Sequence, residues 1–296
     1  MRVGIIGLGR LGSIHLRIYK EIREIKKICL VDTDRSKLAI DTTLASFQDY
    51  KQLLGLVDLV SIATPTTAHF EIARFFLENK VPVLVEKPLT QNIREAEALL
   101  RLARKNKTLL FVGHVERYNS AYLAVKKIIK DPLFIECHRL SPYPWRSLDV
   151  SVVLDLMIHD LDIILYLLKD SVKKIEVKGV KVLSESEDIA NARLTFKNGC
   201  VANITASRIS AKTERKIRIF MPNCYISLDY AQQTVDIYRK LKSQIIKENL
   251  PINKEEPLKK EIIDFVASVK KQRFSIDDAE KAKEALKLAL RIQKAI

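Results

Sequence analysis

Glycine is scarce in this chain. Its 296 residues include only 8 glycines and 9 prolines, where average usage would give about 20 glycines. The hydrophobic fraction of 47% excludes a disordered, collagen-like or low-complexity protein. Four of the eight glycines, at positions 4, 7, 9 and 12, lie within the first twelve residues. The N-terminal segment is therefore the first candidate for a site that requires glycine.

Closely spaced cysteines and long apolar runs are also missing. The four cysteines are far apart and form no C-x-x-C pair, which excludes a small disulfide framework and predicts a reduced, cytoplasmic protein. The apolar run from Val3 to Leu8 is too short for a signal-peptide core. No stretch approaches the roughly 18 apolar residues needed to span a bilayer, so we expect no membrane insertion.

Positive charge is in excess, with 51 Lys and Arg residues against 36 acids and a net charge of +15. The excess is spread over helical stretches, of which RLARKNK at 101–107 is the densest. No zinc-finger, basic-zipper or RNA-recognition pattern accompanies the charge, so nucleic acid is not the expected partner. A solvated surface and a small ligand that carries phosphate are the remaining explanations.

The first 118 residues alternate short apolar runs with helical patterns. The expected strands are Arg2–Ile6, Lys27–Val31, Val57–Ala63, Pro82–Val85 and Thr108–Val112, and the expected helices are Leu11–Ile25, Ala68–Glu78 and Ile93–Lys105. Continuous apolar strands separated by helices indicate a parallel sheet covered on both faces. We therefore predict an α/β fold whose first domain, residues 1–118, is a doubly wound Rossmann domain with its ligand crevice at the carboxyl ends of the strands.

The pattern changes in residues 119–296, which we predict to be a second domain. A helix near Ala121–Ile129, a strand at Phe134–Leu140 and a helix over Val153–Leu168 come first. Strand-like runs then follow with little helix between them until two closing helices, Leu258–Lys271 and Asp277–Ala295. These runs favour a largely antiparallel open sheet. The charged stretch LKSQIIKENLPINKEEP, residues 241–257, is expected to be an excursion from the sheet or a loop.

The glycines at the N-terminus form a G-x-G-x-x-G pattern, which follows a strand and opens a helix. Such a turn brings backbone N–H groups against a pyrophosphate at a helix N-terminus. The pattern predicts cofactor contacts by Gly7, Gly9, Arg10, Leu11 and Gly12.

An acidic residue, Asp32, follows twenty residues after Gly12, at the end of the second strand. A carboxylate there accepts hydrogen bonds from ribose hydroxyls and repels a 2′-phosphate. NAD is therefore the expected cofactor and NADP is less favoured, although the nearby Arg35 weakens the preference. Helix capping by Asp32 is the alternative explanation.

Two further groups of residues are candidates for catalysis. Lys87, within Glu86-Lys87-Pro88, ends a strand and can hold a substrate hydroxyl, with Glu86 as a partner for the cofactor or for Lys87. Asp155 and His159 are four residues apart, so they share one face of a helix. An imidazole there can accept a hydroxyl proton while the carboxylate stabilises the imidazolium. We expect no metal site, because no further histidines lie nearby.

This order of motifs resembles the glucose-fructose oxidoreductase / inositol dehydrogenase family, also called Gfo/Idh/MocA, over essentially the whole chain. The resemblance implies a Rossmann domain, a C-terminal α/β domain whose open sheet forms a homodimer or homotetramer, and nicotinamide-dependent oxidation of sugar or cyclitol hydroxyls. It assigns Lys87 as the catalytic lysine, Asp155 and His159 as the family's D-x-x-x-H pair, and Asp32 as the ribose-binding acid. The loop that lines the nucleotide matches Thr64, Pro65 and His69.

One branch of the family, that of UDP-N-acetylglucosamine 3-dehydrogenases, resembles the chain more closely in stretches such as GHVERYN, HRLSPYPWRSLDV and VLDLMIHDLDI. A Gly-Gly pair that many members carry before D-x-x-x-H is replaced here by VSVVL, residues 150–154, so the local loop differs. A nucleotide-sugar would use arginines for its diphosphate and an aromatic ring for its base. The expected substrate-binding residues are Arg117, Tyr118, Asn119, Arg139, Tyr143, Trp145 and Arg146.

The sequence leaves several activities open. The leading hypothesis is NAD-dependent oxidation of the 3-hydroxyl of a UDP-N-acetylhexosamine. A free sugar, a cyclitol or a sugar acid is the alternative substrate. A regulatory protein that binds NAD without turnover is a third possibility, and transient use of bound NAD to cleave a glycosidic bond is a fourth.

Overall fold

Six strands in the N-terminal part form one parallel sheet. The computed structural model describes residues 1–143 and 150–296, so the predicted site residues Trp145 and Arg146 lie outside the described residues. The strands are β1 (Arg2–Ile6), β2 (Lys27–Val31), β3 (Ala45–Phe47), β4 (Leu59–Ile62), β5 (Val83–Glu86) and β6 (Leu110–Gly113). Their order, β3-β2-β1-β4-β5-β6, is that of a doubly wound Rossmann sheet, as predicted.

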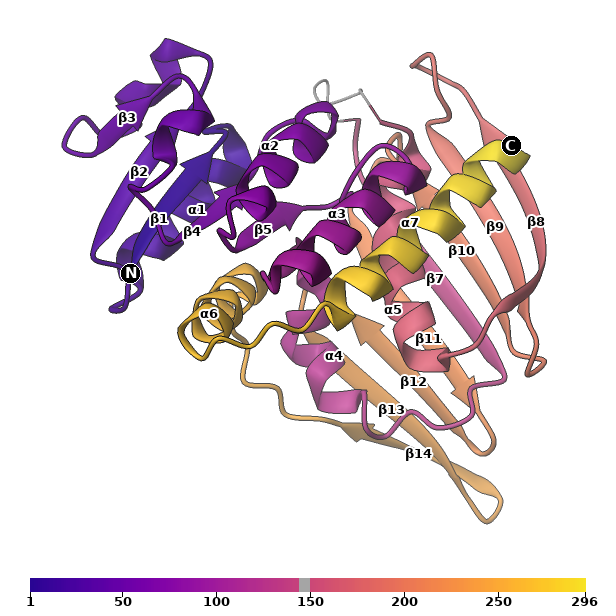
Figure 1. Ribbon diagram of the computed structural model, residues 1–296. Coiled ribbons are helices and arrows are strands. Elements are labelled where there is room, and N and C mark those ends of the chain that lie inside the picture. Colours follow the sequence, from indigo (N-terminus) through magenta and orange to yellow (C-terminus); the bar gives the residue numbers. More distant parts are fainter. Residues whose placement is uncertain (144–149) are drawn as a thin grey trace. The chain divides into compact units, whose positions relative to one another are not determined.

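Burial explains why these short runs become strands. Every residue of β4, β5 and β6 is buried, as expected for parallel strands covered on both faces. The covering helices are α1 (Arg10–Glu21), α2 (Thr66–Glu78) and α3 (Ile93–Asn106), and α2 and α3 pack side by side (Figure 1). Short helical turns, η1 (Arg35–Ile40) and η2 (Tyr50–Leu53), flank β3.

The chain divides into two units that are not continuous in sequence. Residues 258–283 join 1–114 in the first unit, and residues 284–296 join 115–257 in the second. The helix α6 (Pro257–Lys270) is anchored to the first unit by Phe265, whose ring centroid lies 5.7 Å from that of Phe111 in β6. The division into two continuous domains, 1–118 and 119–296, stays a prediction. In the structure, α6 packs with the Rossmann strands.

The second unit is built on an eight-stranded sheet. Its order is β14-β13-β12-β11-β7-β10-β9-β8, with only β7 and β10 parallel. The strands are β7 (Phe134–Leu140), β8 (Val172–Val180), β9 (Ile189–Phe196), β10 (Val201–Ser207), β11 (Glu214–Met221), β12 (Cys224–Asp229), β13 (Thr234–Leu241) and β14 (Gln244–Asn249). Alternate residues are buried along β7 and β10, which is the pattern of a sheet with one covered face.

Helical segments complete the second unit. They are η3 (Val115–Tyr118), α4 (Ser120–Val125), the π-turn η4 (Val153–Met157), α5 (Ile158–Leu168) and α7 (Asp277–Ala295), whose first residues are assigned to the first unit. The single helix expected over 153–168 is thus a π-turn followed by an α-helix. Such a turn inserts an extra residue into the helical repeat, and the apolar pattern alone does not reveal this change.

The loop expected at residues 241–257 is wrong in part, because it contains β14. This strand forms a hairpin with β13 at the edge of the sheet, and all six of its residues are exposed. Because both faces of β14 are exposed, its sequence has no alternation of apolar and polar residues. Edge strands with charged residues are common in natural sheets, because charge discourages pairing with other chains.

Candidate active site

The glycine turn is built so that only glycine fits at two of its positions. Gly7 has φ +88, and a Cβ there would lie 2.7 Å from the carbonyl oxygen of Ala63. A Cβ on Gly12 would lie 1.8 Å from the carbonyl oxygen of Gly7. The turn therefore packs directly on the end of β4, and the first turn of α1 packs directly on the glycine loop.

The middle glycine of the motif is different, because the space beside it is open. No described atom lies within 4 Å of a Cβ built on Gly9, which is the N-cap of α1. Gly9 has no side chain to cap the helix, and Arg10 and Leu11 in the first turn are exposed. Open space beside the N–H groups of a helix N-terminus fits a pyrophosphate. The residues of this turn thus fit a dinucleotide cofactor.

A fixed carboxylate lies beside the turn. Asp32, 8% exposed, accepts hydrogen bonds from the backbone N–H of Leu8 at 2.7 Å and of Asp34 at 2.9 Å. The Nζ of Lys37 lies 3.8 Å from its Oδ2. The carboxylate is therefore held at the carboxyl end of β2, where it can bind ribose hydroxyls, and it has a cation next to it.

The loop after β4 is supported from behind by a histidine. Pro65 is exposed at the N-cap of α2, Thr64 is half-buried, and His69 is only 1% exposed. The Nε2 of His69 lies 2.9 Å from the carbonyl oxygen of Thr64, and its Nδ1 lies 2.9 Å from that of Pro88. Burial lowers the pKa of His69 below its ordinary value, against the opposing effect of these contacts. His69 thus connects the predicted nucleotide loop with the segment after Lys87.

The predicted catalytic lysine follows β5. Lys87 is half-buried, and the preceding residue, Glu86, is 7% exposed. Glu86 Oε1 lies 2.9 Å from Nε2 of His15, a fully buried residue of α1. The Nδ1 of His15 lies 2.7 Å from Ser61 Oγ. Sequence reasoning missed His15. The signal was available, because a histidine in register with the apolar residues of an amphipathic helix requires a buried polar partner.

The second unit holds the predicted acid and base in one helical segment. Asp155 lies in the π-turn η4, and His159 lies in the first turn of α5; both are half-buried. Ser151 fixes the start of this segment, since its carbonyl accepts the N–H of Asp155 at 2.8 Å and its Oγ accepts that of Leu154 at 3.3 Å. π-turns are frequent at functional sites.

Two predicted substrate-binding arginines make ion pairs with the helix that carries His159. Arg139, 3% exposed, contacts Asp160 through Nε at 2.9 Å and through Nη2 at 3.0 Å, and its Nη1 reaches Glu116 at 2.9 Å. Burial alone would lower the pKa of Arg139, but the two carboxylates more than compensate and raise it. Arg117 forms a similar two-point contact with Asp162, with Nε at 2.7 Å from Oδ2.

The remaining predicted substrate residues have different surroundings. Asn119, 2% exposed, caps α4 through the N–H of Ala121 at 3.1 Å and donates to the carbonyl oxygen of Tyr230 at 3.0 Å. Tyr118 and Tyr143 are half-buried. Asn119 therefore supports the local fold, whereas the two tyrosines keep surface that a ligand can contact.

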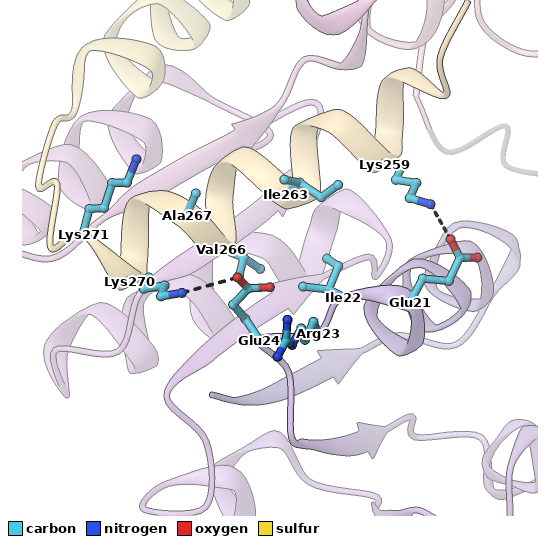
Figure 2. Close-up of a pocket in the computed structure, with 10 residues that line it drawn as sticks. All are labelled: Glu21, Ile22, Arg23, Glu24, Lys259, Ile263, Val266, Ala267, Lys270 and Lys271. Carbon is cyan, nitrogen blue, oxygen red and sulfur yellow. Dashed lines mark hydrogen bonds and ion pairs between the residues drawn. The ribbon is translucent and has the colours of Figure 1, made fainter.

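A hollow elsewhere on the first unit is lined by none of these residues. It lies between the end of α1 and α6, with Ile22 and Val266 in its lining (Figure 2). Lys259 pairs with Glu21 at 2.7 Å, and Lys270 pairs with Glu24 at 3.4 Å. Arg23 and Lys271 also line the hollow, so basic residues outnumber acidic ones there.

Two features are absent from the described residues. Across residues 1–143 and 150–296, no group of three or more His, Cys, Asp or Glu side chains is placed to hold a metal ion. In the same part of the chain, no helix combines the length and the apolarity needed to cross a membrane.

The strand order and the glycine turn define a dinucleotide-binding protein of the Rossmann class. The model of an oxidoreductase family with an NAD-binding Rossmann fold, Gfo/Idh/MocA, matches residues 1–114, and the model of the family's C-terminal domain matches residues 130–226. The chain belongs to the Gfo/Idh/MocA family of oxidoreductases, and the predicted family and fold class are confirmed.

Dehydrogenases are among the relatives that match. The UDP-N-acetylglucosamine 3-dehydrogenase of Acidithiobacillus ferrooxidans is 33% identical over 100% of this chain and 97% of its own length, and its crystal form superposes with a TM-score of 0.92. The myo-inositol 2-dehydrogenase of Thermotoga maritima is 27% identical over 79% of this chain and 77% of its own length. A scyllo-inositol dehydrogenase from Lactobacillus casei, solved with NAD(H) and scyllo-inositol, has 21% identity and a TM-score of 0.84 over 100% of this chain and 96% of that one, which supports the fold.

Proposed function

We propose that this chain is an NAD-dependent dehydrogenase that oxidises the 3-hydroxyl of a UDP-N-acetylhexosamine to a ketone. The observation that carries the proposal is the 33% identity to a UDP-N-acetylglucosamine 3-dehydrogenase over the full chain. The open space beside Gly9 and the fixed carboxylate of Asp32 support a dinucleotide cofactor. The relationship to a myo-inositol 2-dehydrogenase makes a cyclitol the alternative substrate.

The residues have complementary roles in this reaction. NAD held by the glycine turn and Asp32 would supply the hydride acceptor for the carbon that carries the hydroxyl. Lys87 holds the hydroxyl oxygen and stabilises the negative charge that develops on it. His159 accepts the hydroxyl proton, and Asp155 stabilises the imidazolium that forms. One hydride and one proton leave the alcohol, which balances its conversion to a ketone.

Cofactor preference follows from Asp32. Its carboxylate accepts the ribose hydroxyls and would repel a 2′-phosphate, so we propose NAD rather than NADP. Lys37, with its Nζ 3.8 Å from Asp32 Oδ2, reduces the repulsion and makes the preference smaller.

Substrate contacts are proposed for two half-buried tyrosines of the predicted substrate-binding set. Tyr118 and Tyr143 provide rings on which a uracil base can stack. The guanidinium groups of Arg117 and Arg139 already pair with acids of α5, so their contribution is to hold the helix that carries His159. Trp145 and Arg146 remain predicted contacts of the nucleotide-sugar.

Assembly and location are part of the same proposal. The outer face of the eight-stranded sheet carries a row of partly exposed aromatic rings, among them Phe220 and Tyr225, stacked at 4.7 Å. An extended sheet face with aromatic residues suits association with a second copy of the chain. We propose a homodimer or homotetramer in the cytoplasm.

The test is NADH formation with UDP-N-acetylglucosamine, UDP-N-acetylgalactosamine, myo-inositol and glucose in parallel. A preference for the UDP-sugars supports the proposal, and turnover of myo-inositol alone would mean that the substrate is a cyclitol. Lys87→Ala and His159→Ala should each lower kcat by about 100-fold or more, whereas the exposed control Lys105→Ala should not. Product without NADH would indicate transient use of the cofactor, and NAD binding without any product would indicate a regulatory protein.

A further inference from the structure

Lys87 is flanked on both sides by residues that contact a buried histidine. The residue before it, Glu86, lies 2.9 Å from Nε2 of His15. The residue after it, Pro88, has its carbonyl oxygen 2.9 Å from Nδ1 of His69. His15 is 0% and His69 is 1% exposed. Neither contact includes Lys87 itself, so both act on the backbone segment from which its side chain extends.

Each histidine also contacts an element next to the cofactor cradle. His15 lies in α1, the helix whose N-terminus forms the glycine turn, and its Nδ1 lies 2.7 Å from Ser61 Oγ in β4. The Nε2 of His69 lies 2.9 Å from the carbonyl oxygen of Thr64, in the loop that follows β4. The position of Lys87 is thus linked to both segments expected to contact the cofactor.

The carboxylate of Glu86 is also fixed by the available space. Gly113 is its neighbour on β6, and a Cβ there would lie 2.9 Å from Glu86 Oε2 and 3.2 Å from Oε1. The carboxylate therefore occupies space that any side chain at position 113 would need. Losing the buried contact between Glu86 and His15 would be costly in this environment of low dielectric. The contact therefore holds the carboxylate in one position.

We propose that His15 and His69 are positioning residues for Lys87, which hold the segment 86–88 in register with the cofactor cradle. This inference rests on the proposed role of Lys87. Lysine has a long side chain with many rotamers, so the direction in which it leaves the backbone decides where its ammonium can reach. Displacing a catalytic group by about 1 Å can cost about 100-fold in rate.

The first test is a double-mutant cycle with His15→Leu and Lys87→Ala. His15→Leu should lower kcat about tenfold or more in the wild-type background and less than about twofold in the Lys87→Ala background, because residues that act as a unit are not additive. The dissociation constant of NAD should change by less than about threefold. His15→Gln, which retains an N–H donor, should recover part of kcat. Equal losses in both backgrounds would mean that His15 has only a structural role, and would overturn the inference.

A second pair of variants leaves both histidines in place. Gly113→Ala pushes on the Glu86 carboxylate and should lower kcat, whereas Val112→Ala alters the neighbouring position, whose side chain points to the other face of the sheet. Val112→Ala should lower Tm without lowering kcat. If Gly113→Ala retains the wild-type kcat, Glu86 does not position Lys87. These variants also keep the test available if His15→Leu fails to fold.

A third measurement needs no turnover. Acetylation of Lys87 by acetic anhydride can be followed by mass spectrometry, with the exposed Lys37 as an internal reference. His15→Leu and His69→Gln should each change the rate at Lys87 several-fold and leave that at Lys37 unchanged. An unchanged rate at Lys87 would refute the positioning role. If the variants show this pattern but the wild-type protein oxidises neither UDP-sugars nor polyols, only the proposed function is refuted.

Discussion

The glycine turn predicts different effects on stability for two substitutions that add the same methyl group. At Gly9 the new Cβ has no described atom within 4 Å, so Gly9→Ala should change the free energy of unfolding by less than about 1 kcal/mol. The methyl group would occupy the space proposed for the pyrophosphate. We expect the affinity for NAD to fall at least tenfold, which corresponds to about 1.4 kcal/mol.

At Gly12 the cost should appear in the fold. A Cβ there would lie 1.8 Å from the carbonyl oxygen of Gly7, far inside contact distance, so the loop or the helix has to move. Overpacking of this kind costs about 1–3 kcal/mol and can cost more where backbone atoms are involved. Gly12→Ala should therefore lose both stability and NAD binding.

The assay combines urea unfolding without cofactor with calorimetric titration of NAD. The wild type should gain about 2.7 kcal/mol of stability at an NAD concentration 100 times its dissociation constant, and Gly9→Ala should gain clearly less at the same concentration. A Gly9→Ala protein that binds NAD as tightly as the wild type would refute the assignment of this open space to the pyrophosphate. A Gly12→Ala protein of unchanged stability would refute the packing argument.

Three further predictions concern buried or fixed charges. Asp32→Ser removes the carboxylate beside the turn and should raise the ratio of NADP to NAD affinity about tenfold or more, measured by titration of both cofactors; an unchanged ratio would contradict its role. Arg139→Met leaves Asp160 and Glu116 without their cation and should cost about 3–5 kcal/mol in urea unfolding, and a cost below about 1 kcal/mol would be inconsistent with the buried ion pairs. Burial alone would raise the pKa of Asp188, but hydrogen bonds, above all from Ser184, lower it. Its folded pKa is therefore below its unfolded value of about 3.9, and its stabilisation is complete above that value and is lost as the pH falls towards the folded pKa. Asp188→Asn should weaken the dependence of Tm on pH below about pH 4, and an unaltered acid limb would contradict this assignment.

The Rossmann half of the fold was predictable because its strands are buried on both faces. The predicted strands Arg2–Ile6 and Lys27–Val31 coincide with β1 and β2. Their continuous apolar runs have one stable solution, a parallel sheet covered by helices. β14 was not predictable in the same way, since all of its residues are exposed and its strand character comes from pairing with β13.

Of the candidate site, the glycine turn was predictable because its requirement is local. Gly7 and Gly12 are needed for backbone conformation or for the close approach of neighbouring backbone, and Gly9 leaves open the space proposed for the pyrophosphate. These requirements leave a trace within a few residues of sequence. Partners far apart in sequence leave no such trace. Arg139 and Asp160, for example, pair across 21 residues, and their charges alone suggested a phosphate ligand for the arginine.

The sequence by itself thus determined the family, the doubly wound sheet and the position of the cofactor turn, because these depend on short-range patterns of apolar residues and glycine. Only the tertiary structure decided which polar side chains are buried against one another. It placed His15 on Glu86 and His69 on Pro88, 71 and 19 residues away in the chain. Burial makes such contacts specific, since a polar group removed from water needs a partner, and the fold decides which one is within reach.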